Sequence, residues 1–149
     1  MNHIKITQSP LSISCLLALL RRILRCGICP NIYVGEKLEL SNGSTITPNR
    51  DISCDTENLI YCVLCNNCRE CYIGQTGNCL RKRFTVHRQQ IRDPETRQIN
   101  LSEHLEICAN GTNYSIFPFY KVNKPIKSLR LAKEAHFIKL FKPKLNSSV

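Results

Sequence analysis

The sequence predicts an α/β protein built around a small three-stranded antiparallel sheet flanked by helices. One observation is the presence of short segments rich in β-branched and aromatic residues, which is typical of strands. A second is helical spacing of apolar residues in longer segments between and after them. The expected strands are 58–64, 70–73 and 114–122, and the expected helices are 77–92, 101–108 and 127–141. The order of elements is therefore β-β-α-α-β-α, with a cysteine-containing extension in front.

We divide the chain into three parts. Residues 1–25 form a poorly specified lead, helical or disordered, and residues 26–53 form the cysteine-containing extension. The alternating pattern before the Asn42-Gly43 dipeptide predicts a hairpin in this extension, which suits a zinc-binding hairpin. Residues 54–149 form the main domain, whose length is ordinary for a single domain.

The N-terminal apolar run, Leu11 to Leu20, is too short to span a membrane. Arginines follow it where the small residues of a signal-peptide cleavage site belong. We therefore expect an intracellular protein with reduced thiols and no membrane association. A secreted protein with disulfides is the weaker alternative for a chain with 10 cysteines.

The charge balance points to a polyanionic partner. The chain has 21 Lys and Arg against 11 Asp and Glu, a formal charge of +10 and a pI near 9.3. Such a surplus favours nucleic acid. The basic residues gather on two expected helices, where they would contact phosphates: Arg81, Lys82, Arg83, Arg88, Lys124, Lys127, Arg130 and Lys133. DNA is the expected partner, with no small-molecule cofactor, and the nucleus is the expected compartment.

Several short motifs occur in a fixed order in the main domain. They are Asn58-Leu59-Ile60-Tyr61, Tyr72-Ile73-Gly74, Leu80 to Phe84 followed by His87, Glu134 on the last helix, and Asn146 near the end. Residues 54–147 with these motifs resemble the GIY-YIG endonuclease family. The cysteines between the two tyrosine motifs, and upstream of the first, narrow the resemblance to the endonuclease domain of Penelope-like retroelements.

The resemblance implies metal-dependent cleavage of DNA strands and assigns roles to individual positions. Tyr61 and Tyr72 match the motif tyrosines, and Arg83 matches the arginine of the first helix. Glu134 matches the metal-binding glutamate, and Asn146 the asparagine near the end of the domain. One position departs from the family pattern, because Leu59 stands where the first motif has glycine.

The chemistry of these side chains suits phosphodiester hydrolysis. Glu134 is a hard oxygen ligand for one Mg²⁺ or Mn²⁺, and the planar fork of Arg83 matches a phosphate. Tyr61 and Tyr72 can orient a water molecule, whereas a role as base would require a lowered phenol pKa. His87 lies four residues after Arg83 on the same helical face, within reach to relay a proton.

The stretch Cys62-Val-Leu-Cys65-Asn-Asn-Cys68-Arg-Glu-Cys71 raises the question of a metal site. Residues three apart on a strand face opposite sides, so the four sulfurs do not form one cluster. Cys65 and Cys68 form a CxxC pair at the expected turn, which is a common way to present two thiolates to zinc.

Two zinc ligand sets remain open, and both sites could exist. In one, Cys65 and Cys68 join His104 and Cys108, an i, i+4 pair on the middle helix. In the other, an upstream finger uses Cys26, Cys29 and Cys54 with one further ligand. The remaining cysteines are expected to pack as small apolar residues: Cys15, Cys62, Cys71 and Cys79.

The sequence thus predicts a metal-dependent DNA endonuclease derived from a mobile element, which nicks or cleaves its substrate and carries structural zinc. The alternative is a catalytically inactive, zinc-stabilised nucleic-acid-binding fragment of a retroelement.

Overall fold

The computed structural model describes residues 27–33, 35–85 and 101–146 of the 149-residue chain. The strands are β1 (Leu38–Glu39), β2 (Thr45–Ile46), β3 (Leu59–Cys65), β4 (Cys71–Thr76) and β5 (Tyr114–Lys121). The helices are η1 (Cys29–Asn31), α3 (Leu101–Ala109), α4 (Lys127–Phe141) and η2 (Lys144–Asn146), and residues 80–85 are also helical. The predicted α/β class and its three-stranded antiparallel sheet are confirmed.

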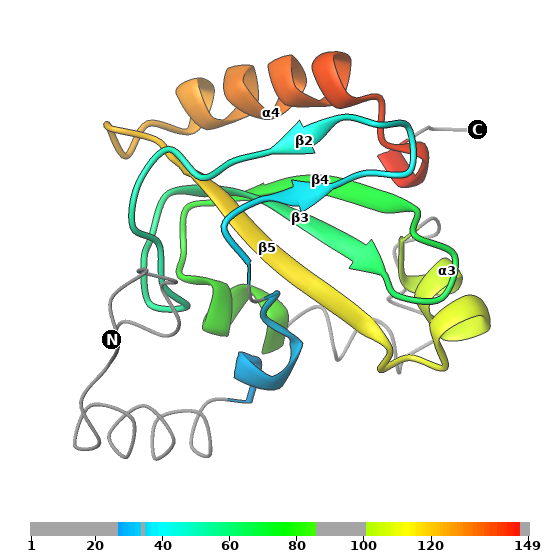
Figure 1. Cartoon of the computed structure of the whole chain (residues 1–149). Helices are drawn as coiled ribbons and strands as arrows, with labels where there is room; N and C mark the ends of the chain where they lie inside the picture. The colour runs from blue at the N-terminus through cyan, green and yellow to red at the C-terminus, as the bar shows by residue number, and fades with distance from the viewer. Residues whose placement is uncertain (1–26, 34, 86–100, 147–149) are drawn as a thin grey trace.

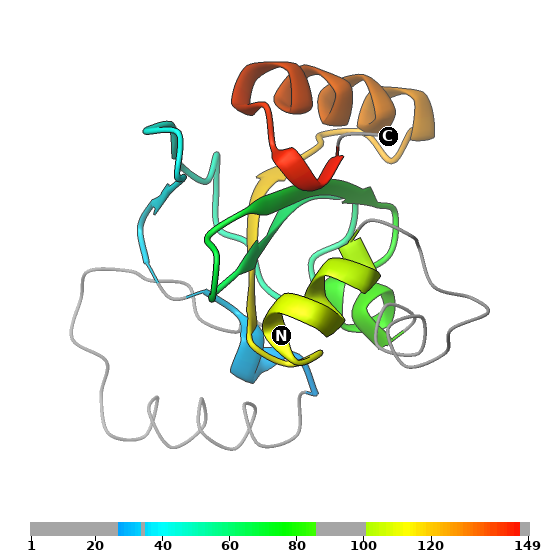
Figure 2. The same cartoon turned by 90° about the vertical axis from the view of Figure 1, so that its right-hand side faces the viewer.

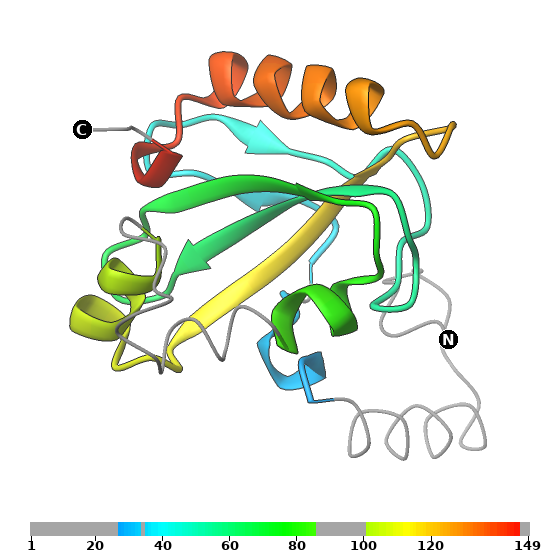
Figure 3. The same cartoon turned by 180° about the vertical axis from the view of Figure 1, so that it is seen from behind.

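The three-stranded sheet has the order β4-β3-β5, and both pairs are antiparallel. Strand β3 is central, and all seven of its residues are buried, so helices must cover both faces of the sheet. Figures 1 and 3 show α4 on one side of the sheet and the helical segment 80–85 on the other, together with η1. Helix α3 lies on the same side as segment 80–85 (Figure 2).

Each face of the sheet has its own apolar core. Residues Leu59, Tyr61, Val63 and Cys65 of β3 pack with Leu80, Phe84 and residues of α3. Their neighbours in β3 face the other side, where they pack with the β1–β2 hairpin and the end of α4. This alternation follows directly from the period of two residues along a strand.

Strand β5 contains a bulge next to Pro118. Tyr61 pairs with Pro118, whereas Ile60 pairs with Tyr120, so Phe119 is an extra residue in β5. The side chain of Phe119 is buried, and its ring packs edge-on against Phe137 of α4, with centroids 5.0 Å apart. The bulge thus lies in an edge strand, where proline is tolerated, and it supplies an anchor for α4.

The predicted hairpin of the extension is confirmed as the β1–β2 pair. Its side chains Leu38, Leu40 and Ile46 belong to the core on the α4 side of the sheet. Asn42 Nδ2 also donates to the carbonyl of Phe141 at 2.8 Å. The boundary at residue 53 remains a prediction, but these contacts tie the extension closely to the sheet.

Two predicted features lie outside the described residues: the lead 1–25, and residues 86–92 of the helix expected at 77–92, which include His87. Cys26, the first residue of the extension, also lies outside them. Within the part of the chain that the structure describes, no helix has the length and apolar character needed to cross a membrane.

Candidate functional sites

Two tyrosines and a glycine lie side by side on one face of the β3–β4 pair. Tyr61 is the cross-strand partner of Gly74, and Tyr72 is the partner of Val63. A Cβ atom at position 74 would approach both the Tyr61 hydroxyl and the Tyr72 Cε1 to 2.8 Å. The glycine of the second motif is therefore required because both phenol rings lie against its Cα.

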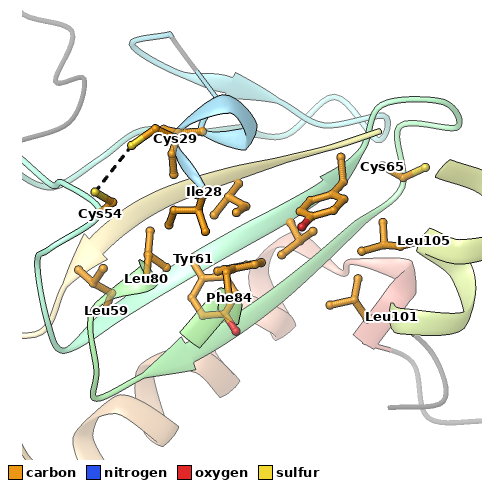
Figure 4. Packing of buried hydrophobic residues seen from close by; sticks show 14 of the residues in the cluster. Ile28, Cys29, Cys54, Leu59, Tyr61, Cys65, Leu80, Phe84, Leu101 and Leu105 are labelled. Carbon is orange, nitrogen blue, oxygen red and sulfur yellow. Dashed lines mark hydrogen bonds between the residues drawn. The ribbon is translucent and has the colours of Figure 1, made fainter. Parts of the chain in front are cut away.

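The helical segment 80–85 brings Arg83 to these tyrosines. Phe84 anchors the segment in the core, with its ring edge-on to Tyr61 at 5.4 Å between centroids (Figure 4). Arg81 forms an ion pair with Asp55, which fixes the outer side of the segment. In this position, Arg83 Nε donates a hydrogen bond to the Tyr61 hydroxyl at 3.3 Å.

The outer edge of β4 receives two residues from the C-terminal part of the chain. Asn146 Oδ1 accepts from the Ile73 N–H at 2.6 Å, and Asn146 Nδ2 donates to the Ile73 carbonyl at 2.7 Å. Two residues further along this edge, the Gln75 N–H faces the carboxyl group of Glu134 and lowers its pKa. Asn146 thus satisfies one outward peptide group of this edge strand, and Glu134 lies beside the next one.

Tyr61, Tyr72, Arg83 and Glu134, hereafter the tyrosine cluster, interact electrostatically with one another. Burial raises the pKa of Tyr61 strongly, against the influence of Arg83, and burial also raises the pKa of Tyr72. Burial raises the pKa of the half-buried Glu134, although the Gln75 N–H and Arg83 counteract this. The positive charge of Arg83 stabilises the ionised form of Glu134, whereas burial destabilises it. The protonation of each member of the cluster therefore depends on the charge of the others.

The raised phenol pKa values bear on the roles of the tyrosines. The protein's own groups keep Tyr61 and Tyr72 protonated at neutral pH, because the effect of burial exceeds that of Arg83. A protonated phenol orients a water molecule or a phosphate oxygen by hydrogen bonding. A role as base would require a bound cation together with Arg83 to lower the phenol pKa.

Leu59 replaces the first-motif glycine without strain. Its side chain is fully buried in the core beneath the sheet. The left-handed backbone conformation lies one residue earlier, at Asn58, with φ of 63°. Asn58 is a residue type that tolerates this conformation, and its Nδ2 donates to the carbonyls of Val122 and Lys124 at 2.7 and 2.8 Å.

The donor set of the tyrosine cluster fits a hard divalent cation. Glu134 supplies one half-buried carboxylate oxygen ligand, and Mg²⁺ characteristically binds through one or two carboxylates while it keeps several waters. Arg83 provides a second positive group beside the carboxylate, so a phosphate can be bound between a cation and a guanidinium.

A second site lies at the opposite end of the β3–β4 pair. Cys65 and Cys68 flank the turn, and His104 and Cys108 come from α3; these four residues are hereafter the Cys/His cluster. Their ligand atoms all lie within 4.8 Å of one another, and Cys68 Sγ is 3.2 Å from His104 Nε2. The structure thus brings together the first of the two predicted ligand sets.

The geometry of the Cys/His cluster fits zinc. Tetrahedral Zn–S bonds of about 2.3 Å place ligand sulfurs about 3.8 Å apart, and the ligand atoms here lie at comparable spacing. Asn67 supports the site from outside, because its Nδ2 donates to both the carbonyl and Sγ of Cys108. The Asn67 amide lowers the pKa of Cys108, as do the neighbouring thiols, whereas burial, together with the neighbouring thiols, raises the pKa of Cys68 to about 11. Cys108 therefore loses its proton more readily, and Cys68 would lose its proton when a metal binds.

The remaining cysteines divide as the strand pattern predicts. Cys62 and Cys71 are buried among apolar residues on the far face of the sheet, away from Cys65. Cys29 and Cys54, from the second predicted ligand set, are buried with their Sγ atoms 3.9 Å apart (Figure 4). Their predicted partner Cys26 lies outside the described residues, so a second zinc site stays a prediction.

Among the described residues, the arginines expected to contact DNA bind the protein itself: Arg81 pairs with Asp55, Arg83 with Tyr61, and Arg130 with Gln75 and Asn58. Arg88 lies outside the described residues. The lysines Lys82, Lys124 and Lys127 are exposed, and Lys133 lies over the Tyr120 ring at 5.1 Å. A guanidinium binds several acceptors in a fixed geometry, whereas an ammonium group remains hydrated.

The sequence did not indicate that Asn58 and Gln75 contact Arg130, which was expected to face DNA. One feature of the sequence could have pointed to Asn58. It is an asparagine directly before a strand, and asparagine is enriched in left-handed backbone conformations.

The fold and the tyrosine cluster together define a small α/β domain with a candidate active site on the β3–β4 pair. The model of the GIY-YIG catalytic domain matches residues 57–146, which is more than half of the chain. The protein therefore belongs to the GIY-YIG family of nucleases. No curated protein and no solved structure gave a match.

Proposed function

We propose that the protein is a metal-dependent DNA endonuclease that hydrolyses phosphodiester bonds. The convergence of Tyr61, Tyr72, Arg83 and Glu134 from four separate segments supports this most strongly. All four belong to the motifs that the family resemblance assigns to catalysis. The basic surface, with exposed lysines beside the last helix, suits a DNA backbone.

In this proposal, each side chain has a distinct role. Arg83 binds a nonbridging phosphate oxygen and holds the Tyr61 hydroxyl. Tyr61 and Tyr72, as protonated phenols, orient the attacking water. Glu134 would hold a Mg²⁺ or Mn²⁺ ion, and the bound ion supplies positive charge to the phosphate oxygens and the leaving 3′ oxygen.

Two further residues that the sequence assigned to catalysis, His87 and Asn146, are not placed among the groups that contact the substrate in this proposal. His87, proposed as a proton relay, lies outside the described residues. Asn146 is a positioning residue in this proposal, because both polar atoms of its amide are bound to the main chain of Ile73. It fixes the strand next to Tyr72 rather than the substrate.

We further propose that the domain derives from a Penelope-like retroelement and acts in the nucleus. The cysteines between the two tyrosine motifs and upstream of the first support this origin, since they are the feature on which the resemblance rests. Zinc in the Cys/His cluster would stabilise the β3–β4 turn.

The test is nicking of supercoiled plasmid by purified protein with Mg²⁺ or Mn²⁺, beside Glu134→Gln. The matched control is Glu103→Gln, which removes an exposed carboxylate from α3. The proposal expects nicking by wild type and the control, and loss in Glu134→Gln with DNA binding retained. If wild type binds DNA but does not nick it with either ion, the alternative of an inactive nucleic-acid-binding module is correct.

A further inference from the structure

The last helix is attached to the sheet in two different ways along its length. Near its C-terminal end, Phe137, Ile138 and Phe141 pack in or against the apolar core. Near its start, Ile126, Leu129 and Leu131 remain 46%, 40% and 43% exposed, and Ile126 provides no side-chain cap. The turn that precedes Glu134 therefore depends on polar contacts for its position.

Arg130 supplies those contacts. Its Nε donates to Gln75 Oε1 at 3.0 Å, and its Nη1 donates to Asn58 Oδ1 at 2.9 Å. One acceptor belongs to β4, and the other lies directly before β3. Arg130 thus joins the start of α4 to both strands of the pair that carries Tyr61 and Tyr72.

Space for the guanidinium comes from Gly77. A Cβ atom at this position would lie 2.9 Å from Arg130 Nη2 and 3.1 Å from its Cζ. The guanidinium therefore lies against the main chain at the end of β4, and the two side chains that accept its hydrogen bonds are neutral amides. The contacts fix its geometry without neutralising its charge.

Gln75 connects this contact to the carboxylate. Its side-chain oxygen accepts from Arg130, and its main-chain N–H faces the Glu134 carboxyl closely enough to lower the pKa of that group. Arg130 and Glu134 are one helical turn apart and lie on the same face of α4. The same β4 residue therefore holds both side chains.

We propose that Arg130 is a positioning residue, which clamps Gln75 and Asn58 and thereby holds the Glu134 carboxylate at the outer edge of β4. The effect on catalysis rests on the proposed nuclease function, whereas the clamp itself does not. A lysine keeps the charge but lacks the fork that reaches two acceptors at once, so the clamp requires arginine.

Steady-state kinetics of plasmid nicking test the catalytic effect in Arg130→Lys, Arg130→Ala and the control Lys139→Ala. Lys139 is exposed in the last turn of the same helix and is not among the lysines expected to contact DNA, so its loss removes one charge without touching the clamp. Both Arg130 variants should lose about 10- to 100-fold in kcat, the size of effect that a misplaced catalytic group produces, while KM changes little. Lys139→Ala should keep its kcat.

Two kinetic outcomes would overturn the proposal. Wild-type kcat in Arg130→Lys would mean that charge alone is needed. A loss confined to KM, with a reduced salt dependence of DNA binding, would mean that Arg130 contacts phosphate instead.

Amide hydrogen exchange tests the clamp independently of activity. In Arg130→Lys, the Gln75 N–H should exchange at least about tenfold faster than in wild type, because the side chain of Gln75 and the helix that covers this end of β4 are no longer held. The Ile73 N–H on the same edge, bound to Asn146, serves as the internal control and should not change. Equal Gln75 exchange in both proteins would refute the clamp, and wild type without nicking activity would refute only the proposed function.

Discussion

At the turn between β3 and β4, three thiols and an imidazole lie within 4.8 Å of one another, a donor set suited to metal–ligand bonds. At the other end of the same strand pair, one guanidinium and three amide groups connect the strands to α4. A single metal ion bound by the Cys/His cluster could stabilise the end of the strand pair at the turn. The end next to α4 depends instead on several weak hydrogen bonds. We therefore expect changes at the turn to affect mainly stability, and changes at the α4 end to affect mainly activity.

The largest expected effect is the loss of zinc from the turn. Cys68→Ser should abolish stoichiometric zinc binding and lower the free energy of unfolding by at least about 3 kcal/mol, a fraction of what zinc contributes to small zinc domains. Urea unfolding together with metal analysis of the reduced protein measures both quantities.

The matched control for this change is Cys62→Ala, which alters a buried thiol on the far face of the sheet. It should cost about 1 kcal/mol by lost packing and leave zinc bound. Less than one zinc per chain in the reduced wild-type protein would contradict the structural role of the Cys/His cluster.

The next largest effect is expected on kcat, with little change in the free energy of unfolding. Tyr61→Phe removes the hydroxyl that accepts from Arg83 and should lower kcat about 10- to 100-fold, the equivalent of one charge-assisted hydrogen bond of about 1.5–3 kcal/mol. The control Tyr114→Phe changes another buried tyrosine that stacks on Phe84 in the same core. Equal kcat values for the two variants would remove Tyr61 from the proposed mechanism.

The two ends also differ in how far the sequence predicts them. The Cys/His cluster consists of two local pairs, a CxxC turn and an i, i+4 helical pair, and each spacing follows from the local structure. Tyr61, Tyr72, Arg83 and Glu134 could be found because their order matches a family pattern. The strands and α4 could be found because alternation and helical periodicity are local properties as well.

The contacts of Arg130 could not be predicted in this way. Its partners Gln75 and Asn58 are 55 and 72 residues away, and amide acceptors have no characteristic spacing. An arginine on a basic helix looks the same in sequence whether it faces DNA or its own sheet. Only the left-handed conformation at Asn58 and the space above Gly77 determine its direction.

A smaller effect is expected where Asn146 binds β4. Asn146→Ala removes both hydrogen bonds to the Ile73 main chain and should lower the free energy of unfolding by about 1–2 kcal/mol. In the control Lys144→Ala, which removes an exposed ion pair with Glu70 in the same segment, the loss should stay below about 1 kcal/mol. If the two variants unfold at the same urea concentration, the edge contact of Asn146 does not contribute to stability.

The smallest expected effects concern two glycines, of which Gly77 leaves space for a neighbouring side chain and Gly43 has a left-handed backbone conformation. Gly77→Ala places a methyl group 2.9 Å from Arg130 Nη2, and the flexible guanidinium must move, so kcat should fall several-fold while stability changes little. Gly43→Ala is the opposite case, because Gly43 has open space around it but φ of 86°. It should cost about 1 kcal/mol through backbone strain and leave kcat unchanged.

A double-mutant cycle shows whether Gly77 acts through Arg130. If the methyl group at position 77 lowers kcat only by displacing the guanidinium, Gly77→Ala has no further effect in an Arg130→Lys background, where the fork is already missing. Additive losses in kcat would mean that the alanine disturbs the tyrosine cluster by another route. The cycle therefore tests whether weak contacts at this end of the strand pair act as one unit, as the ligands of the Cys/His cluster should through zinc.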